Sequence, residues 1–387
     1  MKLNEGFIAR MRDVVAVLQA EGPMAATQAI QQALGGDERA EAPKPSPSPA
    51  WNGRWSSDDV SDISLNEDTE TIPELDRDAP NGAPGVQPDS QRGGQFIAAS
   101  CTNQAGSRHY KVYIPSGYSP DKALPLVVML HGCKQNPDDF AVGTGMNALA
   151  EEHQCVVVYP AQAKRANGSN CWNWFQPGDQ QRGRGEPSII ADITRDVVKR
   201  YALDKNRCYI AGLSAGGAMA AIMGASYPDL YAAVGIHSGL PRGAANNVPS
   251  AFATMKNPTG NGVAGKSSTP AIIFHGDRDA TVHPLNGQHV ADQHAPSAAQ
   301  NPQHDAPAST IRQGSTPRGR RYTVTMRQDA TGKTLTEHWV VHGAGHAWSG
   351  GSPKGSYTDP SGPDASREML RFFYKHSLSD DTPRRDG

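Results

Sequence analysis

One short stretch, residues 207–221, limits the fold of this chain more than any other part of the sequence. It begins as an apolar run, continues through Gly212-Leu213-Ser214-Ala215-Gly216 and ends in residues rich in alanine and glycine. This order is typical of a strand, a sharp turn and a helix. The glycines on either side of Ser214 let the strand and the helix approach closely. We therefore predict a strained turn that presents Ser214 at the top of a sheet.

A serine held in this way can serve as a nucleophile. The G-x-S-x-G pattern, with a strand before it and a helix after it, is the nucleophile-elbow motif. The helix would begin at the serine, so its dipole and free N–H groups would face any negative charge that develops there. The alternative is a glycine-rich turn in which Ser214 has no chemical role. The strand and helix context favours the nucleophile.

Residues 95–378 are predicted to form one α/β domain. Continuously apolar runs are typical of parallel strands buried on both faces. We expect strands at 110–115, 124–130, 155–159, the run before Ser214, 232–236, 271–274, 321–327 and 335–341. We expect helices at 144–153, 187–201, from Ser214 to about 227, and at 366–376, with a polar surface loop at 295–319. This alternation predicts a mostly parallel, doubly wound sheet.

The remaining segments have a different composition. Residues 1–36 carry two short amphipathic patterns that predict a helical hairpin. Residues 37–94 are rich in proline and acidic side chains, so we expect a disordered linker. Residues 379–387 read as a polar tail. Within 387 residues the chain has 40 glycines and 30 prolines, which agrees with a part that does not pack.

Charge, hydropathy and cysteine content exclude several classes of protein. The formal net charge is −2, which gives no basic excess for a nucleic-acid partner. No apolar run reaches 18 residues, so we expect no membrane span. The N-terminus has no continuous apolar segment typical of a signal peptide. Five cysteines without a C-x-x-C pair argue against a metal site and leave room for one or two disulfides.

The acid partner of Ser214 is expected after the 271–274 strand. A serine hydroxyl needs a base to take its proton, and in this architecture the acid and the histidine follow the serine along the chain. The loop His275-Gly276-Asp277-Arg278-Asp279 offers two carboxylates. We prefer Asp279, because the loop can turn back toward the site by that position. Asp277 is the alternative, and otherwise would shape the turn.

The base is expected after the last core strand, where His342 and His346 both lie. We predict His346, because Gly343 and Gly345 free the loop to swing over the sheet. His342 still belongs to the strand, and a structural role is expected for it. Ser214, Asp279 and His346 would then form the catalytic triad.

Two backbone N–H groups should stabilise the oxyanion. One is that of Ala215, directly after the nucleophile, and the other is that of Cys133, after the 124–130 strand. A disulfide of Cys133, with Cys171 as a candidate partner, is a competing interpretation compatible with this role. Trp172, Trp174 and Trp348 flank the site loops and are candidate substrate-binding residues, since aromatic walls suit an acyl chain. For Trp174, closing the core is an equally good interpretation.

Four separated motifs resemble the polyhydroxybutyrate depolymerase family of esterases. They are His131-Gly132-Cys133-Lys134-Gln135, Cys171-Trp172-Asn173-Trp174-Phe175, Gly212–Gly217 and Gly345-His346-Ala347-Trp348-Ser349-Gly350-Gly351. The resemblance runs from about residue 95 to 376. It implies an α/β-hydrolase fold, the triad Ser214–Asp279–His346, and ester hydrolysis without a cofactor or metal. The family also includes feruloyl and acetylxylan esterases, so the resemblance does not fix the substrate.

The expected function is a serine esterase that acts on short hydroxyalkanoate esters or oligomers through an acyl-enzyme. A feruloyl or acetylxylan esterase is the alternative within enzymes. A peptidase, or a non-catalytic binding protein with the same fold, is a further possibility. The expected partner is an ester or polyester substrate, with the oligomeric state left open. The resemblance implies an extracellular enzyme, whereas the N-terminus without a recognisable signal leaves a cytoplasmic one open.

Overall fold

The computed structural model of the protein describes residues 93–258, 265–295 and 309–378. The helical hairpin expected over 1–36, nearly all of the expected linker and the expected tail lie outside the described residues. No helix in the described ranges has the length and apolar character needed to cross a membrane.

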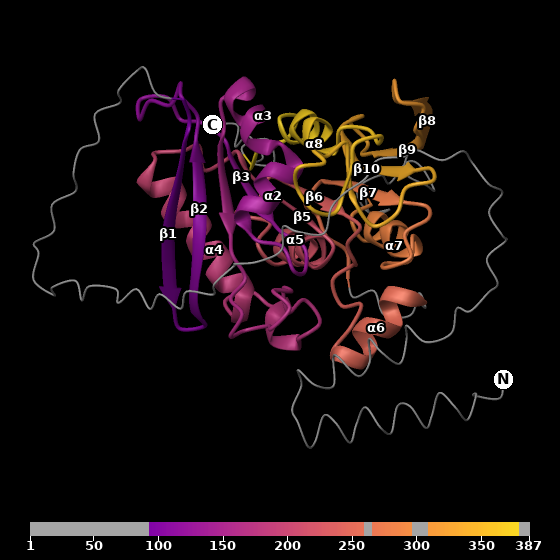
Figure 1. Cartoon of the computed structure of the whole chain (residues 1–387), viewed down its shortest axis with the longest axis horizontal. Helices are drawn as coiled ribbons and strands as arrows, with labels where there is room; N and C mark the ends of the chain where they lie inside the picture. The colour runs from indigo at the N-terminus through magenta and orange to yellow at the C-terminus, as the bar shows by residue number, and fades with distance from the viewer. Residues whose placement is uncertain (1–92, 259–264, 296–308, 379–387) are drawn as a thin grey trace, which may run out of the picture. The chain divides into compact units, whose positions relative to one another are not determined.

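The described residues fold around one sheet whose strands run in the order β1-β2-β4-β3-β5-β6-β7-β10-β9-β8 (Figure 1). The six central strands, from β4 to β10, are parallel, and the two strands at each edge are antiparallel to their neighbours. The strands are β1 (Gln95–Asn103), β2 (Gly106–Ile114), β3 (Leu126–Leu130), β4 (Val156–Pro160), β5 (Cys208–Leu213), β6 (Ala233–His237), β7 (Ala271–Gly276), β8 (Ser309–Ser315), β9 (Arg321–Gln328), β10 (Thr334–Val341), and a separate pair, β11 (Trp348–Ser349) and β12 (Thr358–Asp359).

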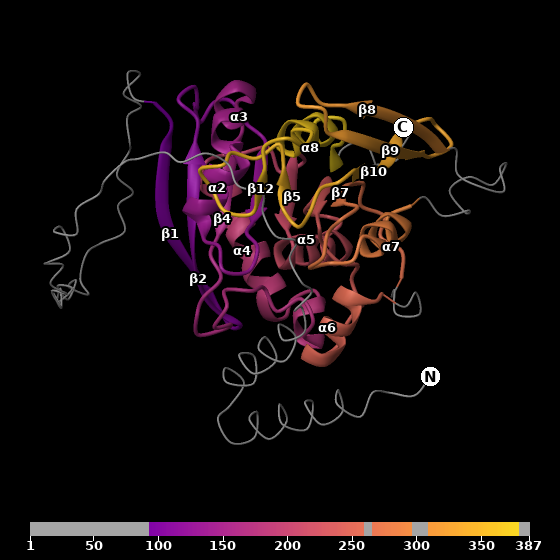
Figure 2. The same cartoon turned by 45° about the vertical axis from the view of Figure 1, so that its right-hand side comes forward.

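Helices cover both faces of this sheet, as Figures 1 and 2 show. Helices α4, α5 and α7 pack on one face, and α2, α3 and α8 pack on the other. The helices are α2 (Pro137–Thr144), α3 (Met146–His153), α4 (Gly185–Arg200), α5 (Ala215–Ser226), α6 (Val248–Lys256), α7 (Leu285–Gln293) and α8 (Ala365–Phe373), with a short 3-10 turn, η1 (Pro177–Gln180). The predicted doubly wound arrangement is confirmed for the central strands.

The central strands are apolar throughout because both of their faces are covered. In β3, Val128 packs with the α4 and α5 side, whereas Val127 and Met129 pack with the α2 and α8 side. This alternation follows from the two-residue period of a strand. Every residue of β3 and of β5 is buried, as a parallel strand between two helix layers requires. The sheet is therefore a rigid platform for the loops at its carboxyl edge.

The structure adds elements that were not expected from the sequence: strands β1 and β8 and helices α2, α6 and α7. The helix expected at 144–153 is α3, which begins two residues later, at Met146, because Gly145 adopts φ 65° and separates α3 from α2. The polar stretch 295–319, expected to be a loop, contains strand β8 within its described part. Strand β8 lies at the sheet edge and is almost wholly exposed, so no alternation of apolar and polar residues marks it.

Candidate active site

Ser214 occupies the turn between β5 and α5. Its backbone has φ 58° and ψ −119°, a conformation that L-residues rarely adopt. A Cβ on Gly212 would lie 2.3 Å from the carbonyl oxygen of Gly216, and one on Gly216 would lie 2.1 Å from that of Leu130. Both positions must therefore be glycine for the strand and helix to meet here. This is the tight turn that the sequence predicts around Ser214.

Asp279 and His346 are joined by a hydrogen bond of 2.7 Å between His346 Nδ1 and Asp279 Oδ2. The other carboxylate oxygen accepts the N–H groups of Thr281 and Val282, at 2.9 and 2.8 Å. His275 Nε2 lies 3.4 Å from Asp279 Oδ2. Burial alone would raise the pKa of Asp279, but the hydrogen bonds from the two histidines hold that pKa well below its usual range. Asp279 is therefore an ionised, fully paired acceptor.

This pairing defines the state of the His346 ring. An ionised carboxylate can only accept, so His346 Nδ1 carries the proton and donates it to Asp279. In the neutral ring, Nε2 then keeps a free lone pair that can accept a proton from a hydroxyl group. The side chain of Asp279 is fully buried, whereas that of His346 retains 12% exposure. The His346 ring is thus held by a hydrogen bond at Nδ1, while Nε2 is free to accept a proton.

The two alternative residues, Asp277 and His342, pair with each other. Their hydrogen bond joins His342 Nδ1 and Asp277 Oδ2 at 2.9 Å, and His342 Nε2 lies 2.9 Å from the hydroxyl of Thr323. Both ring nitrogens of His342 are thus occupied. The N–H of Gly343 donates to the second oxygen of Asp277. This second pair ties the loop after β7 to the loop after β10.

The sheet brings the loops of the predicted triad to one edge. Ser214 follows β5, Asp279 follows β7 and His346 follows β10, and the carboxyl ends of these parallel strands meet at the same edge. His237 ends the intervening strand β6. Its carbonyl accepts the N–H of Ser214 at 2.9 Å, and its ring interacts electrostatically with His346 and Asp279. Ser214 Oγ makes no hydrogen bond to any residue in the described ranges.

Two backbone N–H groups beside this edge have no hydrogen-bond acceptor among the described residues. They belong to Cys133, in the turn after β3, and Ala215, the first residue of α5. Strand β3 lies next to β5 in the sheet, so both groups belong to adjacent loops. Polar backbone groups near the interior are normally paired, and unpaired ones at a helix start can bind an anion. The two donors predicted for the oxyanion are thus uncommitted.

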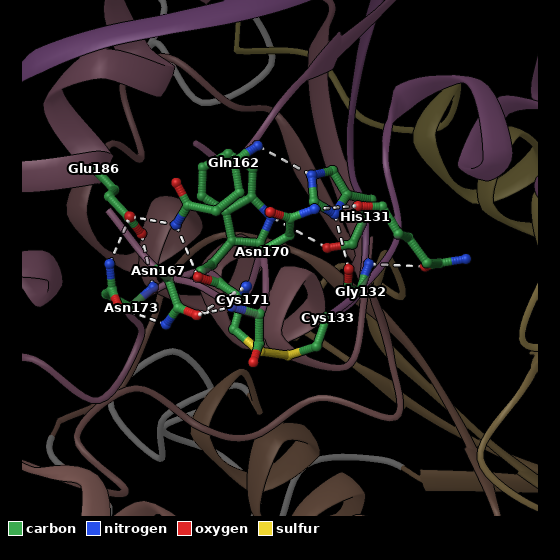
Figure 3. The surroundings of a disulfide bond; sticks show 12 residues. His131, Gly132, Cys133, Gln162, Asn167, Asn170, Cys171, Asn173 and Glu186 are labelled. Carbon is green, nitrogen blue, oxygen red and sulfur yellow. Dashed lines mark hydrogen bonds between the residues drawn. A yellow bond between two sulfur atoms is a disulfide. The ribbon is translucent and has the colours of Figure 1, made fainter. Parts of the chain in front are cut away.

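A disulfide joins Cys133 to Cys171 across 38 positions of sequence. Figure 3 shows the hydrogen bonds that hold both sides of this bridge. Gln162 donates its side-chain amide to the carbonyl of Cys171 at 2.8 Å, and its backbone N–H to His131 Nε2 at 3.1 Å. His131 Nδ1 lies 2.8 Å from the carbonyl of Gly132. The candidate pairing of Cys133 with Cys171 is present, together with a free Cys133 N–H.

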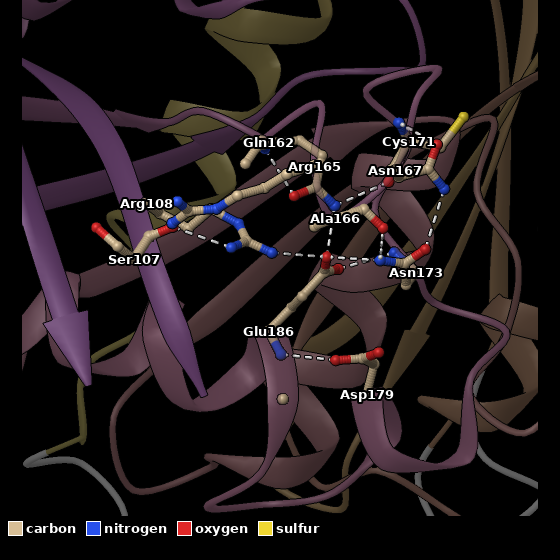
Figure 4. Close-up of polar contacts among 12 residues, drawn as sticks. Ser107, Arg108, Gln162, Arg165, Ala166, Asn167, Cys171, Asn173, Asp179 and Glu186 are labelled. Carbon is tan, nitrogen blue, oxygen red and sulfur yellow. Dashed lines mark hydrogen bonds and ion pairs between the residues drawn. The ribbon is translucent and has the colours of Figure 1, made fainter. Parts of the chain in front are cut away.

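Glu186 is the buried centre of this loop cluster, and the sequence did not mark it (Figure 4). Its carboxylate is 3.1 Å from Arg108 Nη2 and accepts hydrogen bonds from the side chains of Gln162 at 2.5 Å and Asn173 at 2.9 Å. The backbone N–H of Asn173 adds another at 2.7 Å. Burial raises the pKa of Glu186. At the first turn of α4, Glu186 looks like an ordinary dipole-compensating residue, so no sequence signal identified it.

All three predicted substrate-binding tryptophans are core residues. Trp172 is 0% exposed and donates its indole N–H to the carbonyl of His131 at 3.1 Å. Trp348 is 1% exposed, donates to Ser366 Oγ at 3.0 Å and stacks on His237. Both indoles are therefore used to fix the site loops and present no open wall to a ligand. Trp174, at 5% exposure, packs edge-on against Phe175.

Comparison with known families identifies this architecture. The profile of the family described as "Esterase PHB depolymerase" matches residues 108–299, which include Cys133, Ser214 and Asp279. This chain belongs to the PHB depolymerase family of esterases. The α/β-hydrolase fold that the resemblance implied is confirmed.

Individual members and a solved structure show the extent of the similarity. The chain is 36% identical to the poly(3-hydroxyalkanoate) depolymerase C of Paucimonas lemoignei over 205 residues, which is 50% of this chain and 49% of that protein. It is 27% identical to acetylxylan esterase A of Talaromyces purpureogenus, over 68% of this chain and 72% of that one. The structure of an acetyl xylan esterase from Aspergillus awamori has the same fold, with a TM-score of 0.54 and 19% identity over 72% of this chain and 99% of that one. The chain thus spans about half the length of the depolymerase.

Proposed function

We propose that this protein is a serine esterase that hydrolyses short-chain hydroxyalkanoate esters or oligomers through an acyl-enzyme intermediate. The single observation that carries the proposal is the hydrogen bond of 2.7 Å between His346 and the buried Asp279, on loops at the same edge of the sheet as the Ser214 elbow. The unpaired N–H groups of Cys133 and Ala215 add support, since an oxyanion needs two such fixed donors.

The proposed acylation step uses each of these groups once. His346 Nε2 takes the proton of Ser214 as the serine oxygen attacks the ester carbonyl. The carbonyl oxygen becomes an oxyanion, which the N–H groups of Cys133 and Ala215 stabilise. The carbon–oxygen bond to the alcohol then breaks, and His346 returns the proton to the leaving alcohol. Asp279 holds the His346 tautomer and stabilises the imidazolium between these two transfers.

Deacylation repeats this sequence with water in place of the alcohol. His346 Nε2 accepts a proton from the water as its oxygen attacks the acyl carbon. The same two N–H groups hold the second oxyanion, and Ser214 leaves with the proton from His346. The products are a free alcohol and a free carboxylic acid. No cofactor or metal takes part in these steps.

The hydroxyalkanoate substrate is proposed from the relatives. The depolymerase of Paucimonas lemoignei gives the higher identity, and the family profile covers the Ser214 elbow and Asp279. The similarity to an acetylxylan esterase supports the alternative substrate class. The Cys133–Cys171 bridge favours work in an oxidising compartment, where such bonds persist.

A panel of four substrates tests the proposal. It consists of p-nitrophenyl acetate, a linear 3-hydroxybutyrate trimer, methyl ferulate and acetylated xylan. We expect kcat/KM to be highest for the trimer among the three natural ester types, and turnover of each substrate to depend on Ser214. A higher kcat/KM for methyl ferulate or acetylated xylan would move the assignment to a plant-wall esterase. Failure to cleave any of the four would overturn the esterase itself.

A further inference from the structure

A basic pocket of about 460 Å³ lies where three loops meet. Asp277 and Arg278 come from the loop after β7, and His342 comes from the loop after β10. The turn between β8 and β9 supplies Arg318 and Arg320, and Arg321 is the first residue of β9. The pocket is thus lined by four guanidinium groups and a single carboxylate. Such a concentration of one charge can attract and orient an anion.

Two of the four arginines are already committed to the protein. Arg320 forms an ion pair of 3.2 Å with Asp359, and Arg318 donates to a backbone carbonyl at 3.2 Å. The guanidinium groups of Arg278 and Arg321 have no hydrogen-bond acceptor within the described part of the chain. Each keeps its full set of donors for a ligand. The pocket therefore contains two cationic side chains whose N–H groups have no hydrogen-bond acceptor among the described residues.

The carboxylate of Asp277 does not occupy these donors. One of its oxygens accepts from His342 Nδ1, and the other accepts from the backbone N–H of Gly343. Arg278 interacts electrostatically with the Asp277 carboxylate and helps to lower its pKa, but no hydrogen bond joins Asp277 to the guanidinium of Arg278 or of Arg321. The pocket accordingly retains an excess of positive charge that an external carboxylate or phosphate can neutralise.

The pocket is built on the same backbone as the triad loops. Arg278 lies between Asp277 and the triad acid Asp279, and its N–H donates to the carbonyl of Ala344 at 3.0 Å. Ala344 lies two residues before His346. An anion bound by Arg278 would therefore sit on the loops that carry the acid and the base.

We propose that this pocket binds the free carboxylate end of the oligoester chain, or of the acid released from it. The inference rests on the proposed function, because an uncapped hydroxyalkanoate oligomer has one charged group, its terminal carboxylate. Guanidinium groups match the planar geometry of a carboxylate and can bind it through two parallel hydrogen bonds. Arg278 and Arg321 thus make the enzyme selective for oligomers with an uncapped acid end.

The kinetic test compares the 3-hydroxybutyrate trimer with its methyl ester, which has the same ester bonds but no terminal charge. We expect wild-type kcat/KM to be about tenfold higher for the free acid, mostly through KM, as two partly exposed ion pairs would give. Arg278→Gln/Arg321→Gln should bring this ratio close to one. Arg321 is not adjacent to Asp279 in the sequence, and Arg321→Gln alone should lower the ratio of the two kcat/KM values by about threefold. The matched control Arg195→Gln/Arg200→Gln removes two charges on α4 outside the pocket and should keep the wild-type ratio.

Equal kcat/KM for the acid and the methyl ester in wild type would overturn the proposal, as would a preference that survives the double substitution. If neither trimer is cleaved while p-nitrophenyl acetate is, the proposed substrate fails instead.

A binding measurement then tests the pocket independently of substrate turnover. Calorimetric titration of the full chain with 3-hydroxybutyrate and with inorganic phosphate, at fixed ionic strength, should show hydroxybutyrate binding that Arg278→Gln/Arg321→Gln abolishes. Binding of phosphate alone, or hydroxybutyrate binding unchanged in the variant, would overturn the carboxylate site.

Discussion

Asp279 accepts the Nδ1 proton of His346 at 2.7 Å, and two residues earlier Asp277 makes the corresponding contact with His342 at 2.9 Å. Two Asp–His pairs thus connect the same two loops. They differ in surroundings: the Asp279 side chain is fully buried, whereas that of Asp277 is 36% exposed. The two histidines also differ at Nε2, because Nε2 of His342 makes a hydrogen bond with the hydroxyl group of Thr323. Of these two pairs, only Asp279–His346 leaves the second ring nitrogen without a hydrogen bond to a described residue, as the proposed base requires.

This difference separates the two acids by experiment. Asp279→Asn keeps the shape of the side chain but removes the charge that, in the proposed mechanism, stabilises the His346 imidazolium. We expect kcat for p-nitrophenyl acetate to fall on the order of a thousandfold or more, by analogy with the same change in serine proteases. Asp277→Asn should have a much smaller effect, since it disturbs only the loop contact with His342. If Asp277→Asn is the more damaging change, the triad must be rebuilt around Asp277.

The nucleophile is tested by Ser214→Ala. Alanine has no hydroxyl, and it adds no strain beyond that which serine already bears at φ 58°. The variant should fold normally and lose turnover, and a serine-directed phosphonate should label wild type at Ser214 alone. Circular dichroism provides the folding control. Hydrolysis at a rate near that of wild type, or labelling at another residue, would rule out the proposed mechanism.

The elements that could be predicted from the sequence are those defined by local patterns. The Ser214 turn is signalled by two glycines within five residues, and the central strands by unbroken apolar runs. Asp279 and His346 could be proposed because this architecture fixes their chain order and the loops that carry them. Their contact with each other depends on where β7 and β10 lie in the sheet, which the structure supplies.

The features that could not be predicted depend on distant partners or on exposure. Glu186 meets Arg108, Gln162 and Asn173, which come from three separate segments, and no local pattern links them. The burial of Trp172 depends in the same way on its contact with the His131 loop. Strand β8 was missed because an exposed edge strand carries no apolar alternation. The apolar patterns of the sequence therefore predicted the buried central strands better than the exposed edge strands of the sheet.

Removal of the Cys133–Cys171 bridge should reduce both stability and kcat. A closed loop of 38 residues corresponds to about 4 kcal/mol in the chain-entropy treatment. The bridge also holds the turn whose Cys133 N–H is proposed to stabilise the oxyanion. We expect Cys133→Ser/Cys171→Ser to unfold at lower urea concentration and to lose at least tenfold in kcat, since one misplaced oxyanion donor can cost still more. The control is Cys101→Ser, at a free cysteine. An unchanged kcat would show that the turn needs no bridge.

Glu186 should act as a positioning residue for the same turn. Glu186→Gln keeps the side-chain volume but breaks the buried pair with Arg108, which is 3.1 Å away. Loss of one partner of a buried ion pair typically costs about 3–5 kcal/mol. We expect a lower free energy of unfolding together with a fall in kcat and little change in KM. Asp192→Asn, at an exposed position of the same helix, provides the control. A stability loss without any change in kcat would limit Glu186 to a structural role.

The pH dependence of stability should follow from the buried histidines. Burial lowers the pKa of His294 and of His338 to about 4, from an ordinary value of 6.5. On acidification the unfolded chain therefore binds protons first. Above pH 6.5 the two histidines are neutral in both states and do not lower the free energy of unfolding. As the pH falls from 6.5 toward 4, protonation of the unfolded chain lowers that free energy. The lowered pKa of Asp279 acts only below 3.8, outside this window.

His338→Gln isolates one of these groups, because glutamine is neutral throughout the window. For one site with these pKa values, the free energy of unfolding should fall by about 2 kcal/mol between pH 7 and pH 5. Wild type should thus lose about 2 kcal/mol more than the variant over this interval, whatever the absolute stability of each. Urea unfolding at the two pH values gives both differences directly. Equal losses in the two proteins would mean that His338 binds its proton in the folded state as readily as in the unfolded chain.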